Sequence, residues 1–321
     1  MAGDAAAQSD PCRTRVPLVL RQPVPRHTVA AADRDAVTTG DGLRLRTPRQ
    51  GAHGPADLPM TPPACLGIVD WGIGGIGLVR ELDRHVPALP VLYWSDAGAT
   101  PYGRMCSADL TARLHAVVSE LARRGATEVV LACNAASTVT PRLSRAPVPV
   151  EGIIRHGLAS VPDDVRGPVG VVGGRRTIAS GCYRRGLARP GREVLSRVAQ
   201  PLSAHIEAGT TGSPGFIADL RRIVAPLQRA HAVVLACTHY PAVNDWFTDA
   251  LPDATLIDPA QRLAAAIAAR HPAAQAGPVA PRTYLTSGDT EAMRRGAALA
   301  WGVELVAKPA VTLDELHTRF H

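Results

Sequence analysis

The feature that most constrains the fold is an approximate internal repeat, in which an apolar segment runs directly into a cysteine. Residues 128–132 read Glu-Val-Val-Leu-Ala and precede Cys133, and residues 232–236 read Ala-Val-Val-Leu-Ala and precede Cys237. A short apolar run that ends at polar or turn residues is typical of a strand buried on both faces of a sheet. The repeat therefore predicts two related units, each with a thiol at the carboxyl end of a strand.

Strand-like and helix-like segments alternate from residue 66 onward. Strands are expected at 66–70, 91–94, 128–132, 169–172 and 232–236, and helices at 76–85 and 111–124. Asp70 lies 63 positions before Cys133, and Gly173 lies 64 positions before Cys237. The alternation predicts an α/β fold of two pseudo-symmetric domains with mainly parallel sheets and an active site in the cleft between them.

The chain divides into four segments by composition and pattern. Residues 1–61 are rich in Pro, Gly, Ala and Arg without periodicity, so we expect a disordered extension, and Met60 offers an alternative start. The first α/β domain is predicted at 62–157, the second at 158–259, and a C-terminal segment that returns to the first domain at 260–321.

Composition limits the partners and the compartment. The net charge of +7 comes almost wholly from scattered arginines, since Lys308 is the only lysine, which argues against a nucleic-acid surface and suits attraction of a small anion. No apolar run is long enough to span a membrane, and no export signal precedes the first strand. We therefore expect a cytoplasmic protein with reduced thiols.

Two thiols that face one cleft suit the inversion of a stereocentre. Inversion by deprotonation needs a base on one face of the carbon and an acid on the other, and a thiol can be tuned to either state. His239 lies two positions after Cys237, and Asp70 ends the strand that opens the first unit, so each can assist a cysteine. Asn134 and Thr238 follow the cysteines directly and can hold a carboxylate. A pyridoxal mechanism would need a lysine, and Lys308 has no phosphate loop beside it, so no cofactor is expected. No third ligand accompanies Cys237 and His239, so no metal is expected.

Four motifs in order resemble the glutamate racemases of the aspartate/glutamate racemase superfamily. They begin with Asp70 before Gly74-Gly75, continue with Pro101-Tyr102-Gly103 and Cys133-Asn134-Ala135-Ala136-Ser137, and end with Cys237-Thr238-His239-Tyr240-Pro241. The resemblance implies an isomerase of two α/β domains, commonly dimeric, that makes D-glutamate for peptidoglycan.

The resemblance also implies a role for each site residue. Cys133 would take the α-proton from the D-enantiomer with support from Asp70, and Cys237 from the L-enantiomer with support from His239. Substrate-binding positions would be Asn134, Thr238, Glu207 and the Pro101, Tyr102, Gly103 loop. His239, rather than a glutamate after Cys-Thr, favours glutamate as the acidic amino-acid substrate.

Two departures leave other functions open. At two of the substrate-binding positions that the resemblance implies, the family carries Ser and Thr, whereas this chain has Trp71 and Ala135. Trp71 adds a large indole to the expected pocket. Loss of two hydroxyls can weaken substrate binding, so the chain could act on another amino acid or carbon acid, or be an inactive binding or regulatory homologue.

A dinucleotide site is the rival from another class. Residues 72–77 fit G-x-G-x-x-G between a strand and a helix, and Asp96 ends the next strand. This interpretation leaves both cysteine motifs unexplained.

Overall fold

The computed structural model describes residues 64–310, which belong to one compact unit of the chain. The predicted disordered extension at residues 1–61 and the alternative start at Met60 lie outside the described residues.

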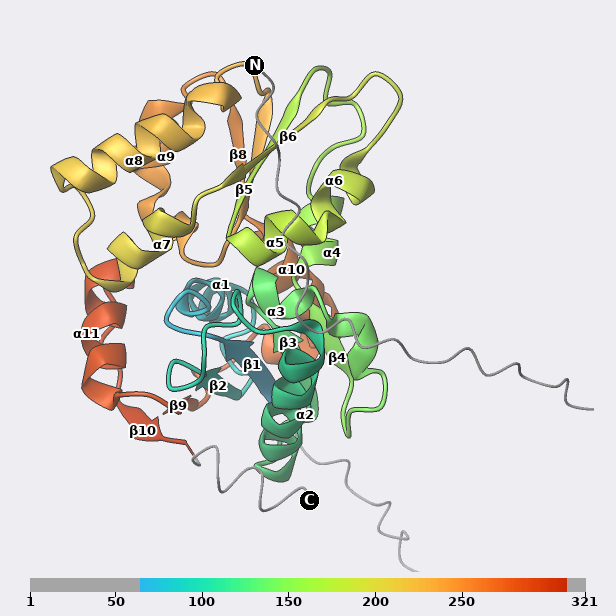
Figure 1. Cartoon of the computed structure of the whole chain (residues 1–321). Coiled ribbons are helices and arrows are strands. Elements are labelled where there is room, and N and C mark those ends of the chain that lie inside the picture. Colours follow the sequence, from blue (N-terminus) through green and yellow to red (C-terminus); the bar gives the residue numbers. More distant parts are fainter. Residues whose placement is uncertain (1–63, 311–321) are drawn as a thin grey trace, which may run out of the picture. The chain divides into compact units, whose positions relative to one another are not determined.

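The first sheet has the strand order β10-β9-β2-β1-β3-β4, and its neighbouring strands all pair in parallel. The two last strands come from the C-terminal part of the chain and extend the sheet beyond β2 (Figure 1). Its strands are β1 (Leu66–Asp70), β2 (Val91–Ser95), β3 (Glu128–Leu131), β4 (Val150–Gly152), β9 (Arg282–Thr286) and β10 (Ala307–Pro309).

The second sheet has the order β6-β5-β7-β8 and is also parallel throughout. Its strands are β5 (Val169–Gly173), β6 (Val194–Val198), β7 (Ala232–Ala236) and β8 (Thr255–Ile257). The order matches β2-β1-β3-β4 of the first sheet position for position, so Cys133 and Cys237 follow equivalent strands. The predicted α/β class with two related parallel sheets is confirmed, whereas the domain boundaries at 157 and 259 stay predictions.

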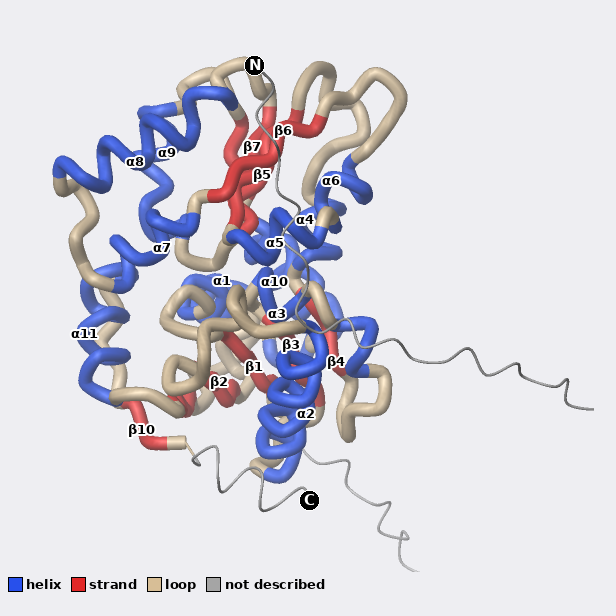
Figure 2. The backbone as a smooth tube through the Cα atoms, viewed as in Figure 1, coloured by secondary structure: helices blue, strands red, loops and turns tan. Residues whose placement is uncertain are grey.

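Helices cover both faces of each sheet (Figure 2). The first sheet packs against α1, α10 and α11 on one face and α2 on the other, and the second against α7, α8 and α9 on one face and α4 and α6 on the other. Parallel strands with side chains buried on both faces explain the continuous apolar runs in the sequence. The helices are α1 (Ile76–His85), α2 (Ser107–Arg123), α3 (Asn134–Ser137), α4 (Ile154–Ala159), α5 (Arg175–Ser180), α6 (Cys182–Leu187), α7 (Gln200–Glu207), α8 (Pro214–Val224), α9 (Asn244–Ala250), α10 (Pro259–Arg270) and α11 (Thr290–Trp301), with 3-10 turns η1 (Thr140–Leu143), η2 (Ala225–Leu227), η3 (Tyr240–Val243) and η4 (Pro272–Ala274).

The helix that was expected at 111–124 begins earlier, at Ser107. Cys106 caps it, since its sulfur accepts a hydrogen bond from the backbone N–H of Asp109 at 3.5 Å. Cysteine is not among the usual capping residues, which is why the sequence pattern placed the start too late.

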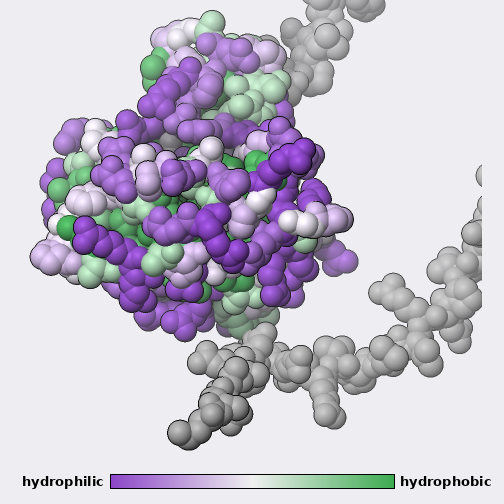
Figure 3. Space-filling view, turned by 90° about the horizontal axis from the view of Figure 1, so that it is seen from above, coloured by the Kyte–Doolittle hydropathy of each residue, from purple (hydrophilic) through white to green (hydrophobic). Residues whose placement is uncertain are grey.

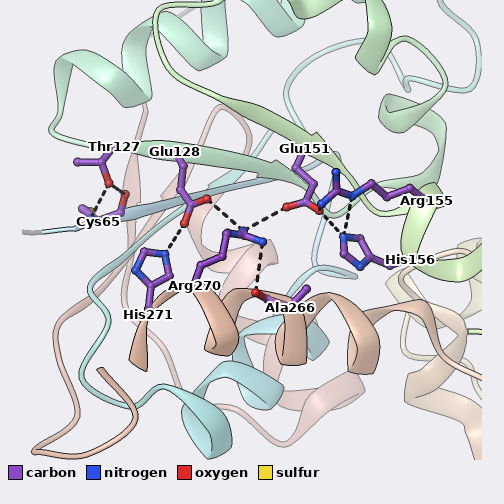
Figure 4. A network of polar contacts seen from close by, with 9 residues as sticks. All are labelled: Cys65, Thr127, Glu128, Glu151, Arg155, His156, Ala266, Arg270 and His271. Atoms are coloured by element: carbon purple, nitrogen blue, oxygen red, sulfur yellow. Dashed lines mark hydrogen bonds and ion pairs between the residues drawn. The ribbon is translucent and has the colours of Figure 1, made fainter. Parts of the chain in front are cut away.

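A chain of charges ties the end of α10 to β3 and β4 (Figure 4). Arg270 bridges the two carboxylates, at 3.0 Å from Glu128 and 3.1 Å from Glu151. His271 bonds Glu128 at 2.5 Å, and His156 and Arg155 both contact Glu151. The network fixes the C-terminal end of the helix whose N-terminal end lies at the candidate site described below.

Replacing Glu151 by Gln should destabilise the fold by about 2 to 3 kcal/mol at pH 7, because the side chain is only 12% exposed and its partners would lose a shared charge. Burial opposes ionisation of Glu151, but its bond to His156 and the charges around it outweigh burial and lower its pKa. A lowered pKa gives stability that is present above the unfolded-state value, about 4.3, and is lost as pH falls through the folded value. The difference between wild type and variant in the free energy of unfolding, measured in urea, should therefore be smaller at pH 3 than at pH 7.

Glu193→Gln is the matched control. It breaks an ion pair with Arg229 in which the side chains are 51% and 60% exposed, so its effect on unfolding should be far smaller. Equal destabilisation by the two variants would contradict the assignment of a structural role to the Glu151 network.

The face in Figure 3 is mostly hydrophilic, with hydrophobic residues in small groups. Large exposed apolar side chains in the described part of the chain are limited to Val198, Trp246, Val279, Leu299 and Val306. No helix between residues 64 and 310 is long and apolar enough to cross a membrane.

Candidate active site

The site forms where the carboxyl ends of the central strands of both sheets gather. Asp70 ends β1, and Cys133 follows β3 closely enough that its N–H lies 3.5 Å from the carbonyl oxygen of Val69. In the second sheet Cys237 follows β7, whose last residue is in register with Gly173 at the end of β5. Open α/β sheets bind their ligands at this edge.

Cys237 belongs to a thiol–imidazole–carboxylate chain. Its sulfur lies 3.7 Å from Nδ1 of His239, and Nε2 of the same ring lies 2.5 Å from Oε1 of Glu207 at the end of α7. His239 is 6% exposed. The arrangement orients the imidazole so that it can exchange a proton with the thiol.

The electrostatics of this chain favour a charged imidazole. Burial alone would lower the pKa of His239, but its bonds to Cys237 and Glu207 and their charges raise it well above the usual value. Burial likewise opposes ionisation of Glu207, yet its bond to His239 lowers its pKa overall. The pair is therefore an imidazolium and a carboxylate at neutral pH.

The loop after β1 packs directly against Thr238, His239 and Glu207, and it carries glycine at the two positions of closest approach. A Cβ on Gly74 would lie 2.3 Å from Oγ1 of Thr238 and 2.7 Å from Nδ1 of His239, and one on Gly72 would lie 2.2 Å from Oε1 of Glu207. The N–H of Ile73 donates to that same carboxylate oxygen at 3.4 Å. The glycines allow the backbone of the first sheet's loop to approach residues that follow strands of the second.

Cys133 lies at the N-terminus of the short helix α3, beside Asp70. Burial raises the pKa of Cys133 well above the usual value, and the charge of Asp70 adds to this, while backbone N–H groups of Ala136 and Ala135 partly offset it. Burial also raises the pKa of Asp70, against the opposing charge of His239. A carboxyl with a raised pKa is a better proton acceptor for a neighbouring thiol.

The two thiols share one electrostatic environment, because charge on Cys237 raises the pKa of Cys133. A cavity of about 10 Å³ lies beside Cys237 and Thr238 and is also lined by Asn134, the neighbour of Cys133. That volume is roughly the minimum for one water molecule. A larger cavity of about 270 Å³ lies between α1 and α10 and contains neither thiol, so size alone does not locate the chemistry.

Asn134 is 2% exposed, and its carboxamide is bonded on one side only. Its Oδ1 accepts a hydrogen bond from the hydroxyl of Tyr183 at 2.8 Å, whereas its Nδ2 has no partner among the described residues. Asp70 has a similar asymmetry: its Oδ1 accepts from the N–H of Trp71 at 2.6 Å, and its Oδ2 is buried without a hydrogen bond. The ends of β1 and β3, two neighbouring strands of the first sheet, thus present an unpaired acceptor and an unpaired donor near Cys133.

The indole of Trp71 points toward the loop after β2. Its Nε1 donates to the carbonyl of Ala99 at 3.0 Å, and the ring packs against the apolar cluster that contains Trp94 and Leu131. Ala135 is half-buried against the same cluster. Both departures from the family motifs therefore serve packing in the first sheet.

The loop at residues 101–103, which was expected to bind the substrate, uses the side chain of Tyr102 to anchor itself to the first sheet. Tyr102 is 1% exposed, and its hydroxyl donates to Oδ2 of Asp96 at 2.8 Å, so its side chain anchors the loop. Pro101 and Gly103 are half-buried, and a Cβ on Gly103 would lie 3.9 Å from Gln200, which comes from the second sheet's side.

The dinucleotide interpretation is contradicted by Asp96. Instead of facing a ribose, this carboxylate is fully buried, and Arg113, Tyr102 and Ser287 all donate to it. A Cβ on Gly74 would meet Thr238 and one on Gly77 would meet Trp301, so these two glycines allow close packing within the protein.

The sequence did not point to Tyr183, Asp258 or Trp301, although they surround the site. Tyr183 bonds Asn134, and the other two line the small cavity. Each comes from a helix or cap with no motif around it, so only proximity in space identifies them. Among residues 64–310 no group of three His, Cys, Asp or Glu side chains is arranged to hold a metal ion.

Comparison with known proteins relates this chain to amino-acid racemases at the level of both sequence and structure. The family model Asp/Glu/Hydantoin racemase matches residues 66–267. Glutamate racemase from Desulforudis audaxviator is 30% identical over 257 residues, covering 74% of this chain and 94% of that protein. Glutamate racemase from Corynebacterium diphtheriae is 33% identical over 208 residues, covering 63% and 78%. The crystal structure of glutamate racemase from Thermus thermophilus in complex with β-chloro-D-alanine aligns with a TM-score of 0.71 at 26% identity, covering 79% of this chain and 99% of that one.

Proposed function

Because this chain belongs to the Asp/Glu/hydantoin racemase family, we propose that it is a cofactor-independent racemase that interconverts L- and D-glutamate. The single observation that carries the proposal is the placement of two thiols after equivalent strands of two related sheets whose strand-end loops meet, since Gly74 after β1 approaches Thr238 and His239 after β7. D-Glutamate from such a reaction would supply peptidoglycan synthesis.

The proposed reaction moves one proton off the α-carbon and another onto its opposite face. Cys133 as thiolate takes the proton from D-glutamate, and the electron pair of the broken C–H bond stays on the carbon as a carbanion. The thiol of Cys237 then gives its proton to the other face, leaving L-glutamate, and the roles reverse in the other direction. Asp70 can accept the Cys133 proton and return it, and the His239 imidazolium can donate a proton to the Cys237 thiolate and take it back, with Glu207 holding the imidazole.

The unpaired polar atoms are proposed as substrate contacts. The Nδ2 of Asn134 can donate to a substrate carboxylate, and the Oδ2 of Asp70 can accept from an ammonium group. Thr238 and backbone N–H groups after the strands, including those of the 101–103 loop, complete the set. Since a cavity of about 10 Å³ cannot hold an amino acid, the lobes carrying the two sheets must separate for the substrate to enter.

The function is tested by incubating the full chain in D₂O with L- or D-glutamate and following the α-proton by NMR. We expect each enantiomer to lose its α-proton and to yield its mirror image carrying deuterium. Absence of exchange from both enantiomers would remove the glutamate assignment.

A second candidate substrate class is favoured by Trp71 and Ala135, which replace hydroxyl-bearing residues of the family motifs. The same exchange assay with a panel of other L- and D-amino acids distinguishes it. Exchange with another amino acid but not glutamate would assign a related racemase, and exchange with none would favour a binding or regulatory homologue.

We also propose the assembly and the setting of the enzyme. The domains are residues 62–157 and 158–259, with 260–321 returning to the first. A homodimer in the cytoplasm is proposed from the resemblance to the family and the need for reduced thiols, and light scattering would measure the assembly.

A further inference from the structure

We propose that Tyr183 is a positioning residue, whose hydroxyl fixes the Asn134 carboxamide so that its N–H₂ group faces the substrate cleft; this rests on the proposed function of the same site. Nothing in the sequence motifs includes Tyr183, which lies in α6 beside the second sheet.

An unpaired buried donor is the starting observation. Nδ2 of Asn134 is inaccessible to solvent and has no partner among the described residues, and burying such a group without a hydrogen bond costs stability. If the Asn134 carboxamide could rotate freely, its Nδ2 group would turn toward any nearby acceptor. Another residue must therefore fix the orientation of the carboxamide. The unpaired Nδ2 then gains a hydrogen bond only when a ligand binds beside it.

The hydroxyl of Tyr183 provides that restraint. It lies 2.8 Å from Oδ1 of Asn134 and donates to it, which directs the opposite end of the carboxamide away from α6. Burial raises the pKa of Tyr183, and the charges of Asp258 and Cys182 add to the rise, so the hydroxyl keeps the proton it donates. Asn134 lines the small cavity together with Cys237 and Thr238, which is where a substrate carboxylate would lie.

The absence of a side chain at Gly157 makes space for the hydroxyl of Tyr183. A Cβ on Gly157 in α4 would lie 2.3 Å from the Tyr183 oxygen and 2.9 Å from its ring. Tyr183 is otherwise enclosed in the apolar cluster with Val171 and Val234, and its hydroxyl donates to Asn134. The close packing around the ring restricts its movement.

The bond also joins the two lobes, since Asn134 follows a strand of the first sheet and Tyr183 packs on the second. Opening of the cleft would separate them and free the carboxamide to rotate. The donor is then aligned for a carboxylate only in the closed state, which couples substrate affinity to closure.

The test is a double-mutant cycle with Tyr183→Phe and Asn134→Ala in the full chain. Tyr183→Phe should raise KM for glutamate about tenfold, the factor for one hydrogen bond, with kcat changed less than about threefold. In the Asn134→Ala background the same change should raise KM less than about twofold, because the restraint has nothing left to hold. Tyr284→Phe, a half-buried tyrosine on β9, is the matched control and should leave KM unchanged. Equal effects of Tyr183→Phe in both backgrounds would overturn the proposal.

A readout independent of catalysis is the ¹⁵N side-chain amide signal of Asn134, assigned by its loss in Asn134→Ala. Tyr183→Phe should shift or broaden this signal, and Tyr284→Phe should not. An unchanged signal in Tyr183→Phe overturns the positioning role whether or not the protein racemises glutamate. A wild type without exchange, together with a shifted amide signal, would instead defeat the proposed function and leave the restraint established.

Discussion

Cys133→Ala and Cys237→Ala should each lower racemisation of glutamate by about 10³-fold or more, because each removes the only proposed acid–base group on one face of the α-carbon. The loss of kcat/KM must be equal in both directions, since the two enantiomers have the same free energy. Polarimetry or coupled detection of each enantiomer measures it.

Solvent exchange separates the two variants where racemisation cannot. In D₂O, Cys133→Ala keeps Cys237, which can remove the α-proton of L-glutamate and return a deuteron to the same face. It should therefore give deuterated L-glutamate without D-glutamate, and Cys237→Ala should give deuterated D-glutamate without L-glutamate. Cys182→Ala, which removes a half-buried thiol on α6, serves as the control and should racemise normally. Full activity in either site variant would refute the two-thiol scheme.

His239→Asn should lower kcat by about 10² to 10³-fold, because the Cys237 thiol loses the group that lies 3.7 Å away and exchanges protons with it. Glu207→Gln should cost less, since it keeps the imidazole but weakens the 2.5 Å bond that orients and charges it.

The pH profile gives the sign of the effect. Burial lowers the pKa of His239, but the bonds to Cys237 and Glu207 raise it by more. The imidazolium therefore persists at neutral pH and is lost only as pH rises through the raised value. Glu207→Gln should move the alkaline limb of kcat against pH to lower pH. An alkaline limb at the same pH in wild type and Glu207→Gln would contradict the proposed pairing.

Several properties followed from the sequence because they depend on local pattern. The apolar strands Leu66–Asp70, Glu128–Leu131 and Ala232–Ala236 were predictable, because such runs are typical of strands buried on both faces of a parallel sheet, and so were the cysteines that come after two of them. The matching strand orders of the two sheets confirmed the internal repeat. Strand-end polar residues gather at one edge of a parallel sheet, so their placement near one another was also predictable.

Other properties needed the tertiary structure, because they depend on which side chains meet across elements far apart in the sequence. Tyr102 lies in a loop that was expected to bind the substrate, and only the structure shows that its hydroxyl donates to the buried Asp96. Trp71 was expected to place its indole in the pocket, yet this indole donates to the carbonyl of Ala99. Tyr183 carries no motif, and its bond to Asn134, 49 positions away, exists only because helices of the two sheets pack together. Periodicity determines which residues are buried, whereas the partner of a buried polar group is decided by packing between elements, where each donor must find an acceptor away from water.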